Sequence, residues 1–284
     1  MKRFLIIGVL ILFAFLAGAQ DAAEKITQAN EALSSGDYAK AFGLYDDAMK
    51  NLGDVQVDAS INYNIGYAAY RADKFTEAIT YFDAAIEAVA NVAKSWEYKA
   101  NAYNKLEDYS NAVQCFEKAA EIAEDGNDAL IYNAGIAAYK GNDFDKAVEL
   151  FSQAVEMGYK AETAQYYKAV VLKKQGKDEE YKQALIEGVE KFPGNKRLSQ
   201  GLAKEYVSDG NTLYKKGVAV LNAANEKVNG GTLKTTDDAY AAEVEKAKTE
   251  FKAAAEILEK ATQLDPSNDN ASKLLDACKQ NLSI

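Results

Sequence analysis

The sequence predicts an all-α solenoid of about six helical hairpins, the last with elongated helices, followed by a C-terminal capping helix. Small and aromatic residues recur with a period of about 34 residues. The 284 residues include only two prolines, Pro193 and Pro266, and a proline costs about 3 kcal/mol in a helix interior. Long helices are therefore possible. Because each unit of a repeat array packs only on its neighbours, the length does not require separate globular domains.

The amino terminus has the composition of a secretory signal peptide. Lys2 and Arg3 precede an apolar run over residues 4–16, and residues 17–19, Ala-Gly-Ala, give the small-x-small pattern that signal peptidase recognises. The apolar run is shorter than the ~20 residues that a membrane-spanning helix needs. We therefore expect cleavage after Ala19 and a periplasmic or secreted chain with no stable membrane insertion. The alternative is an uncleaved membrane anchor.

Four units of the repeat align on one aromatic residue each, and five columns around it hold small or aromatic residues at constant offsets. Small residues at helical spacing let two helices approach closely, while the aromatics fill the space beside the next pair. Polar residues precede each aligned aromatic, which ends one helix and caps the next. Each unit is therefore predicted to be a helical hairpin. The columns are Ala29, Gly66, Ala100 and Gly135; Tyr38, Phe75, Tyr109 and Phe144; Ala41, Ala78, Ala112 and Ala147; Tyr45, Phe82, Phe116 and Phe151; and Ala48, Ala85, Ala119 and Ala154.

These columns resemble the tetratricopeptide repeat (TPR), whose order of small, aromatic, Ala, aromatic and Ala residues they reproduce. Trp96 stands where that family often carries Trp. The resemblance covers roughly residues 22–266 and implies antiparallel helix pairs stacked into a right-handed superhelix. A weaker fifth unit places Pro193 where the family has a helix-ending proline, so repeats one to five are predicted over residues 20–195. Its columns hold Ala169, Asp178, Tyr181, Leu185 and Gly188.

The sixth repeat, over residues 196–266, is predicted to be stretched. With Gly210 in the small column, its aromatic is expected at position 219 but comes at Phe251, 32 residues later. Apolar stripes continue on both sides of the insertion, so both helices are lengthened into a projecting hairpin with its tip at residues 229–238. Residues 267–284 form the predicted capping helix. A stretched final repeat of this kind resembles those of bacterial cell-envelope TPR proteins.

The composition argues against several function classes. The absence of His removes His/Cys zinc sites and the Ser-His-Asp and Cys-His nucleophile systems. A formal charge of -10 with no basic block argues against a nucleic-acid partner. The acidic residues fit no EF-hand, and the glycines form no phosphate-binding loop. We therefore expect no enzyme, no cofactor and no metal site; the alternative from the enzyme class is a hydrolase accessory with carboxylate chemistry.

The two cysteines, Cys115 and Cys278, are predicted to be small buried core residues. Three repeats separate them in a solenoid, which places their Cα atoms beyond the ~7 Å limit for a disulfide. The alternative is an intermolecular bridge through Cys278.

The candidate partner-binding residues lie on the first helices of the repeats, which line the concave groove in the family that this chain resembles. Tyr offers rigid apolar area with a hydroxyl, and Asn pairs with both the N–H and the C=O of an extended peptide. The alternative is that these residues only pack within the array, because Tyr-Asn at the start of the first helix is common in that family. The candidates are Asn30, Tyr63, Asn64, Tyr67, Lys94, Tyr98, Asn101, Tyr132, Asn133 and Tyr166.

Some members of that family bind a C-terminal carboxylate with two Lys, two Asn and one Arg. Asn30, Asn64 and Lys94 fill three of those places, while Ile26 and Tyr98 replace two cations, so we do not expect such a clamp. The predicted function is a secreted or periplasmic TPR adaptor that binds a protein or peptide through its groove and projecting hairpin. The alternative is a structural spacer or self-assembling subunit of a cell-envelope complex with no groove ligand.

Overall fold

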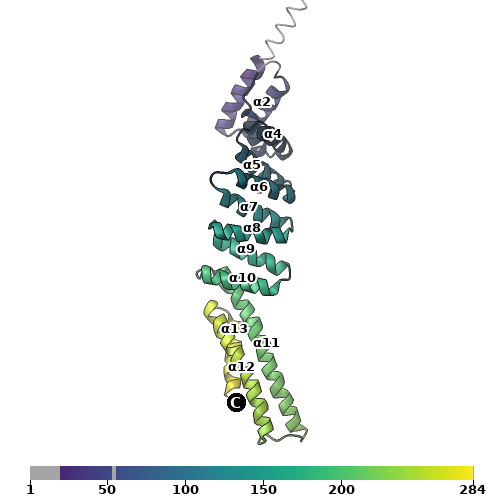
Figure 1. The fold of residues 1–284 in the computed structure, drawn as a ribbon, viewed down its shortest axis with the longest axis vertical. Coiled ribbons are helices and arrows are strands. Elements are labelled where there is room, and N and C mark those ends of the chain that lie inside the picture. Colours follow the sequence, from purple (N-terminus) through teal and green to yellow (C-terminus); the bar gives the residue numbers. More distant parts are fainter. Residues whose placement is uncertain (1–19, 53–55, 284) are drawn as a thin grey trace, which may run out of the picture. The chain divides into compact units, whose positions relative to one another are not determined.

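The computed structural model describes residues 20–52 and 56–283, and every regular element within these ranges is a helix (Figure 1). The predicted all-α class is confirmed. The chain divides into two compact units, residues 1–164 and 165–284. The predicted signal peptide lies outside the described residues, and none of the described helices is long and apolar enough to cross a membrane.

The first unit is built of helical hairpins in chain order. Its first hairpin pairs a helix over residues 20–35 with α2 (Tyr38–Lys50). From α2 to α8, each helix packs against the next one in the chain. The following hairpins are α3 (Ile61–Arg71) with α4 (Phe75–Glu87), α5 (Val92–Lys105) with α6 (Tyr109–Ile122), and α7 (Asn127–Lys140) with α8 (Phe144–Met157).

The hairpin turns lie at the predicted polar residues. The side chains of Asp37, Asp108 and Asp143 each accept a hydrogen bond from the backbone N–H three residues later, which caps α2, α6 and α8. One residue of each turn has the left-handed backbone conformation that stops the preceding helix. These residues are Gly36, Asp73, Glu107 and Asn142, with φ of 81°, 58°, 61° and 61°.

The aligned columns form the core of the first unit. Ala41, Ala78, Ala112 and Ala147 are fully buried, and the ring column of Tyr45, Phe82, Phe116 and Phe151 is at most 1% exposed. A Cβ atom built on Gly66 would lie 2.8 Å from the Phe82 ring. The small column therefore makes room for the aromatic column, as the repeat pattern predicts.

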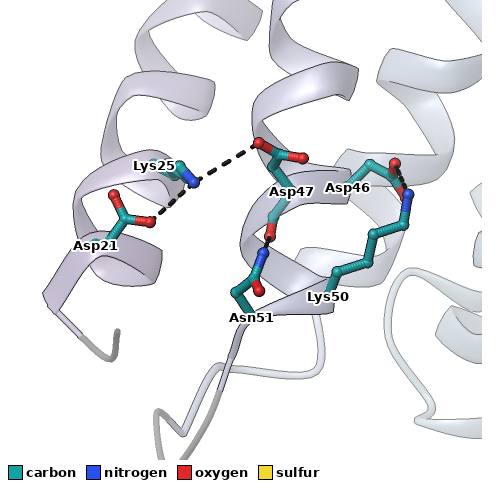
Figure 2. A network of polar contacts seen from close by, with 6 residues as sticks. All are labelled: Asp21, Lys25, Asp46, Asp47, Lys50 and Asn51. Atoms are coloured by element: carbon teal, nitrogen blue, oxygen red, sulfur yellow. Dashed lines mark hydrogen bonds and ion pairs between the residues drawn. The ribbon is translucent and has the colours of Figure 1, made fainter. Parts of the chain in front are cut away.

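Figure 2 shows polar contacts of the first hairpin. Lys25 Nζ lies 2.8 Å from a carboxylate oxygen of Asp21 and 3.6 Å from one of Asp47, which links the helix over residues 20–35 to α2. On α2, Lys50 pairs with Asp46 at 2.6 Å. These pairs lie at the surface, where ion pairs contribute little stability.

The second unit contains the elongated hairpin. Helix α9 (Ala161–Lys174) crosses the division between the units, and α10 (Asp178–Lys191) follows it. The next two helices, α11 (Lys196–Asn229) and α12 (Asp238–Leu264), have 34 and 27 residues and pack along each other. The capping helix α13 (Asp269–Leu282) packs on both. The predicted elongated hairpin and capping helix are confirmed, while the division into repeats at 20–195, 196–266 and 267–284 stays a prediction.

Candidate partner-binding site

A surface pocket of about 530 Å³ lies over α5, the end of α6 and the start of α7; we call it the α5–α7 pocket. It brings together Lys94 and Asn133, two of the predicted partner-binding residues. The pocket lies within the first unit. Its lining is Asn91, Val92, Ala93, Lys94 and Glu97; Ile122, Ala123, Glu124, Asp125 and Gly126; and Ala129, Leu130 and Asn133.

A residue with a left-handed backbone conformation precedes each of two helices that form the pocket, α5 and α7. Gly126, with φ of 75°, precedes α7, and Asn91, with φ of 49°, precedes α5. Val89, in the same loop as Asn91, has φ of 54° although its side chain is β-branched. A left-handed conformation costs such a residue about 1–2 kcal/mol. The loop before α5 therefore holds backbone strain beside the pocket, a feature that clusters at functional sites.

Apolar side chains are exposed at and near the α5–α7 pocket. Ile122, which lines it, is 44% exposed, and Val89, two residues before the lining residue Asn91, is 80% exposed. The pocket therefore has exposed apolar area beside its polar groups.

The polar groups of the pocket suit a peptide. Lys94 Nζ lies 2.7 Å from a carboxylate oxygen of Glu97 and remains 64% exposed, so the ammonium group is accessible. The Asn133 side chain makes no hydrogen bond with another described residue, and its amide has both donors and an acceptor to offer. One ammonium group, three carboxylates and two side-chain amides thus surround an apolar surface.

Three other candidate residues, Tyr63, Tyr67 and Tyr98, pack together around Phe82 instead. The ring centroids of Tyr67 and Tyr98 are 5.1 Å apart, and the Tyr98 ring stacks on Phe82 at 5.9 Å. Burial raises the pKa of Tyr98 to about 12, with nearby tyrosines adding a smaller effect. These tyrosines therefore fit the alternative that they pack within the array. We call this set of four rings the tyrosine cluster.

Comparison with known proteins settles the family. Two models described as tetratricopeptide repeat match the chain, one over residues 26–93 and the other over residues 91–160. The chain belongs to the tetratricopeptide repeat family. TPR arrays are scaffolds for protein–protein interaction and are generally not enzymes. Among the described residues of this TPR protein, no group of three or more His, Cys, Asp or Glu side chains is arranged to hold a metal ion.

The chain also matches solved structures of other proteins. A TPR repeats protein from Bacteroides fragilis NCTC 9343 is 23% identical, with 92% of this chain and 98% of that chain covered and a TM-score of 0.38. A tetratricopeptide repeat protein from Parabacteroides merdae ATCC 43184 is 19% identical, with 92% and 99% covered and a TM-score of 0.48. MamA from Desulfovibrio magneticus RS-1 is 16% identical, with 60% and 94% covered and a TM-score of 0.47. No curated protein matches the chain.

The remaining candidates lie outside the α5–α7 pocket of the TPR array. Asn30 accepts a hydrogen bond from the Tyr45 hydroxyl, which ties its amide to the core. Tyr132 is 7% exposed, and Tyr166 belongs to the second unit, where its ring contacts Tyr167. Asn64 and Asn101 are partly buried on α3 and α5.

The sequence analysis missed the apolar part of the pocket. Val92, Ile122 and Leu130 line it, but each is spaced as an ordinary apolar residue near a helix end. The available signal was Ile122, an apolar side chain two residues before the polar stretch 124–128. Nothing in the spacing distinguishes such a residue from one that is buried.

Proposed function

We propose that this protein is a periplasmic or secreted TPR adaptor that binds an extended segment of a partner protein in the α5–α7 pocket. The observation that carries the proposal is the convergence of Lys94 and Asn133 with the exposed Ile122 on one concave surface. An extended backbone leaves N–H and C=O groups unpaired, and the Asn133 amide can satisfy one of each. Ile122 and the half-buried Val92 offer contact area to an apolar side chain of the same segment.

The cellular location is part of the proposal and is supported by the basic and apolar pattern of residues 1–19. Mass spectrometry of the protein purified from producing cells tests it directly. We expect a chain that begins at Gln20, found in the envelope or medium. A cytoplasmic chain that begins at Met1 would refute this location and leave the binding proposal standing.

Site-specific crosslinking tests the binding surface. A photoreactive amino acid in place of Ile122 should give an adduct with a partner protein in cells. The double variant Lys94→Ala with Asn133→Ala should reduce that adduct by about tenfold, which corresponds to the loss of one charge-assisted and one neutral hydrogen bond.

The matched control is Lys118→Ala with Gln114→Ala. Lys118 pairs with Glu121 at 2.8 Å, in the same three-residue spacing as Lys94 with Glu97, but outside the pocket. The adduct should be unchanged in this control. An adduct that forms only between two copies of the chain would favour the spacer or self-assembly role, and an adduct insensitive to both double variants would refute the pocket as the binding surface.

A further inference from the structure

A second concave site lies in the second unit, between the first helix of the elongated hairpin and the capping helix. This pocket of about 540 Å³, the α11–α13 pocket, receives Lys204 and Asn211 from α11 and Asn270 and Lys273 from α13. No candidate residue of the sequence analysis lies in it. All of its lining residues belong to the second unit.

The charge of the α11–α13 pocket is opposite to that of the whole chain. The protein has a formal charge of -10, yet the pocket lining holds two lysines and no acidic residue. Lys204 and Lys273 are exposed and form no ion pair with any described residue. The lining of the pocket therefore carries a net positive charge.

Three carboxylates near the pocket are engaged elsewhere. Glu205, next to Lys204 in the chain, lies 3.7 Å from Lys173, and Asp209 pairs with Lys182 of α10. On α12, Glu259 pairs with Lys279 at 3.2 Å. Asp269 and Asp276 stand one helical turn from Lys273 on α13, but neither forms an ion pair with it, so both pocket ammonium groups can attract a carboxylate from outside.

The floor of the pocket is apolar and fixed. Val207, Tyr214 and Leu274 line it, and all three pack against the buried cluster that contains Leu258 and Cys278. The Tyr214 ring also contacts Phe251, with ring centroids 5.5 Å apart. A side chain placed on this floor would meet a preorganised surface, which lowers the entropic cost of binding.

We propose that the α11–α13 pocket binds an acidic segment of a partner protein. Two carboxylate side chains of the segment pair with Lys204 and Lys273, and an apolar side chain between them covers Val207, Tyr214 and Leu274. The side chains of Asn211 and Asn270, which form no hydrogen bond with another described residue, pair with the backbone of the segment. This site goes beyond the proposed function, because it gives the protein a second binding surface with its own charge selectivity.

Fluorescence anisotropy with the full chain tests the proposal. The probe is a labelled peptide, Gly-Asp-Glu-Leu-Asp-Glu-Gly, with a C-terminal amide, and the comparison is Gly-Asn-Gln-Leu-Asn-Gln-Gly in the same form. The acidic peptide should bind at least about tenfold more tightly, and its affinity should fall as salt rises from about 50 to about 500 mM. Lys204→Gln with Lys273→Gln should lower the affinity by about tenfold or more.

The control Lys215→Gln with Lys216→Gln removes the same charge from exposed positions of α11 outside the pocket. This control should bind the acidic peptide as tightly as the unmodified chain does. Lys94→Ala with Asn133→Ala should also leave the affinity for the acidic peptide unchanged, so a failure of this proposal can be told apart from a failure of the α5–α7 proposal. Equal losses of affinity in the two double-lysine variants would overturn the site, because the overall charge of the protein would then explain the binding. No binding of the acidic peptide would also overturn it. Equal binding of Gly-Asn-Gln-Leu-Asn-Gln-Gly prepared with a free C-terminal carboxylate would overturn it as well, because the acidic side chains would then not be needed.

Discussion

A Cβ atom built on Gly217 of α11 would lie 2.7 Å from Cε1 of Phe251 of α12, closer than real Cβ atoms come to a neighbour. Gly210 approaches Leu258 in the same way, at 2.6 Å. Both glycines lie in the interior of α11, where glycine is otherwise unfavourable. The elongated hairpin therefore uses glycine for close approach of its two helices, as Gly66 does with Phe82 in the second repeat.

Gly217→Ala should lower the free energy of unfolding of the second unit by about 1–3 kcal/mol, because the added methyl group overpacks the Phe251 contact. Gly43→Ala on α2 is the control, since nothing lies within 4 Å of its Cβ position. That variant should gain about 0.5–1 kcal/mol from the better helix propensity of alanine. Urea denaturation followed by circular dichroism measures both, and a Gly217 variant as stable as the unmodified chain would contradict the overpacking argument.

The repeat columns made the fold predictable, because burial of Ala41, Phe82 and their equivalents follows directly from spacing. The tip of the long hairpin was predictable too: α11 ends at Asn229 and α12 begins at Asp238. The candidate binding site was less predictable from the sequence than the fold. Tyr67 and Tyr98 have a spacing that fits both a groove and a packed cluster, and only the approach of neighbouring helices decides between them. The α5–α7 pocket also depends on the backbone conformation of the loops before α5 and α7, which helical periodicity does not encode.

Tyr67→Ala and Asn101→Ala should therefore differ in their effects on stability. The Tyr67 ring contacts Tyr38 at 5.9 Å and Tyr98 at 5.1 Å, and its hydroxyl accepts a hydrogen bond from Arg71 at 2.7 Å. Its loss should cost about 2 kcal/mol or more. Asn101 makes no side-chain hydrogen bond with a described residue, so its loss should stay within ~0.5 kcal/mol. Equal effects in thermal unfolding would show that the tyrosine cluster does not stabilise the array.

Tyr98 should make the stability of the protein sensitive to alkaline pH. An unfolded tyrosine loses its proton near pH 10, whereas burial raises the pKa of Tyr98 in the folded chain to about 12. The stability contributed by the protonated ring is thus fully present below about pH 10 and is lost as the pH rises to about 12. Tyr98→Phe keeps the ring and removes this proton. Urea midpoints from about pH 9 to pH 12 should fall less steeply for the variant, and parallel curves would refute the assignment.

Both cysteine side chains are free and buried, which predicts slow thiol chemistry in the native protein. Burial raises the pKa of Cys115 to about 11 and also raises that of Cys278. Since the thiolate is the reactive form, a thiol reagent at about pH 8 should react slowly with the folded chain. Two thiols per chain should appear in denaturant without reductant. A chain with no free thiol would indicate an intramolecular disulfide, and one linked to a second copy through Cys278 would favour self-assembly.

The outer part of the elongated hairpin should be removable without unfolding the rest. The contacts that hold its base, Gly217 with Phe251 and Gly210 with Leu258, lie outside the segment 221–247, and α13 packs at Leu258. Ala224 and Ala247 are the buried residues that this segment contributes to α11 and α12, and both are small. Burial of such side chains contributes far less than burial of a Leu or Phe.

We therefore expect that replacing residues 221–247 with a Gly-Asn-Gly turn leaves cooperative thermal unfolding, measured by circular dichroism, in place. The same variant should still bind the acidic peptide, because the lining of the α11–α13 pocket ends at Tyr214 on α11. Loss of cooperative unfolding would show that the whole hairpin is part of the core. Retained folding with loss of a native partner would instead identify the outer hairpin as an interaction element, because only its surface would have been removed.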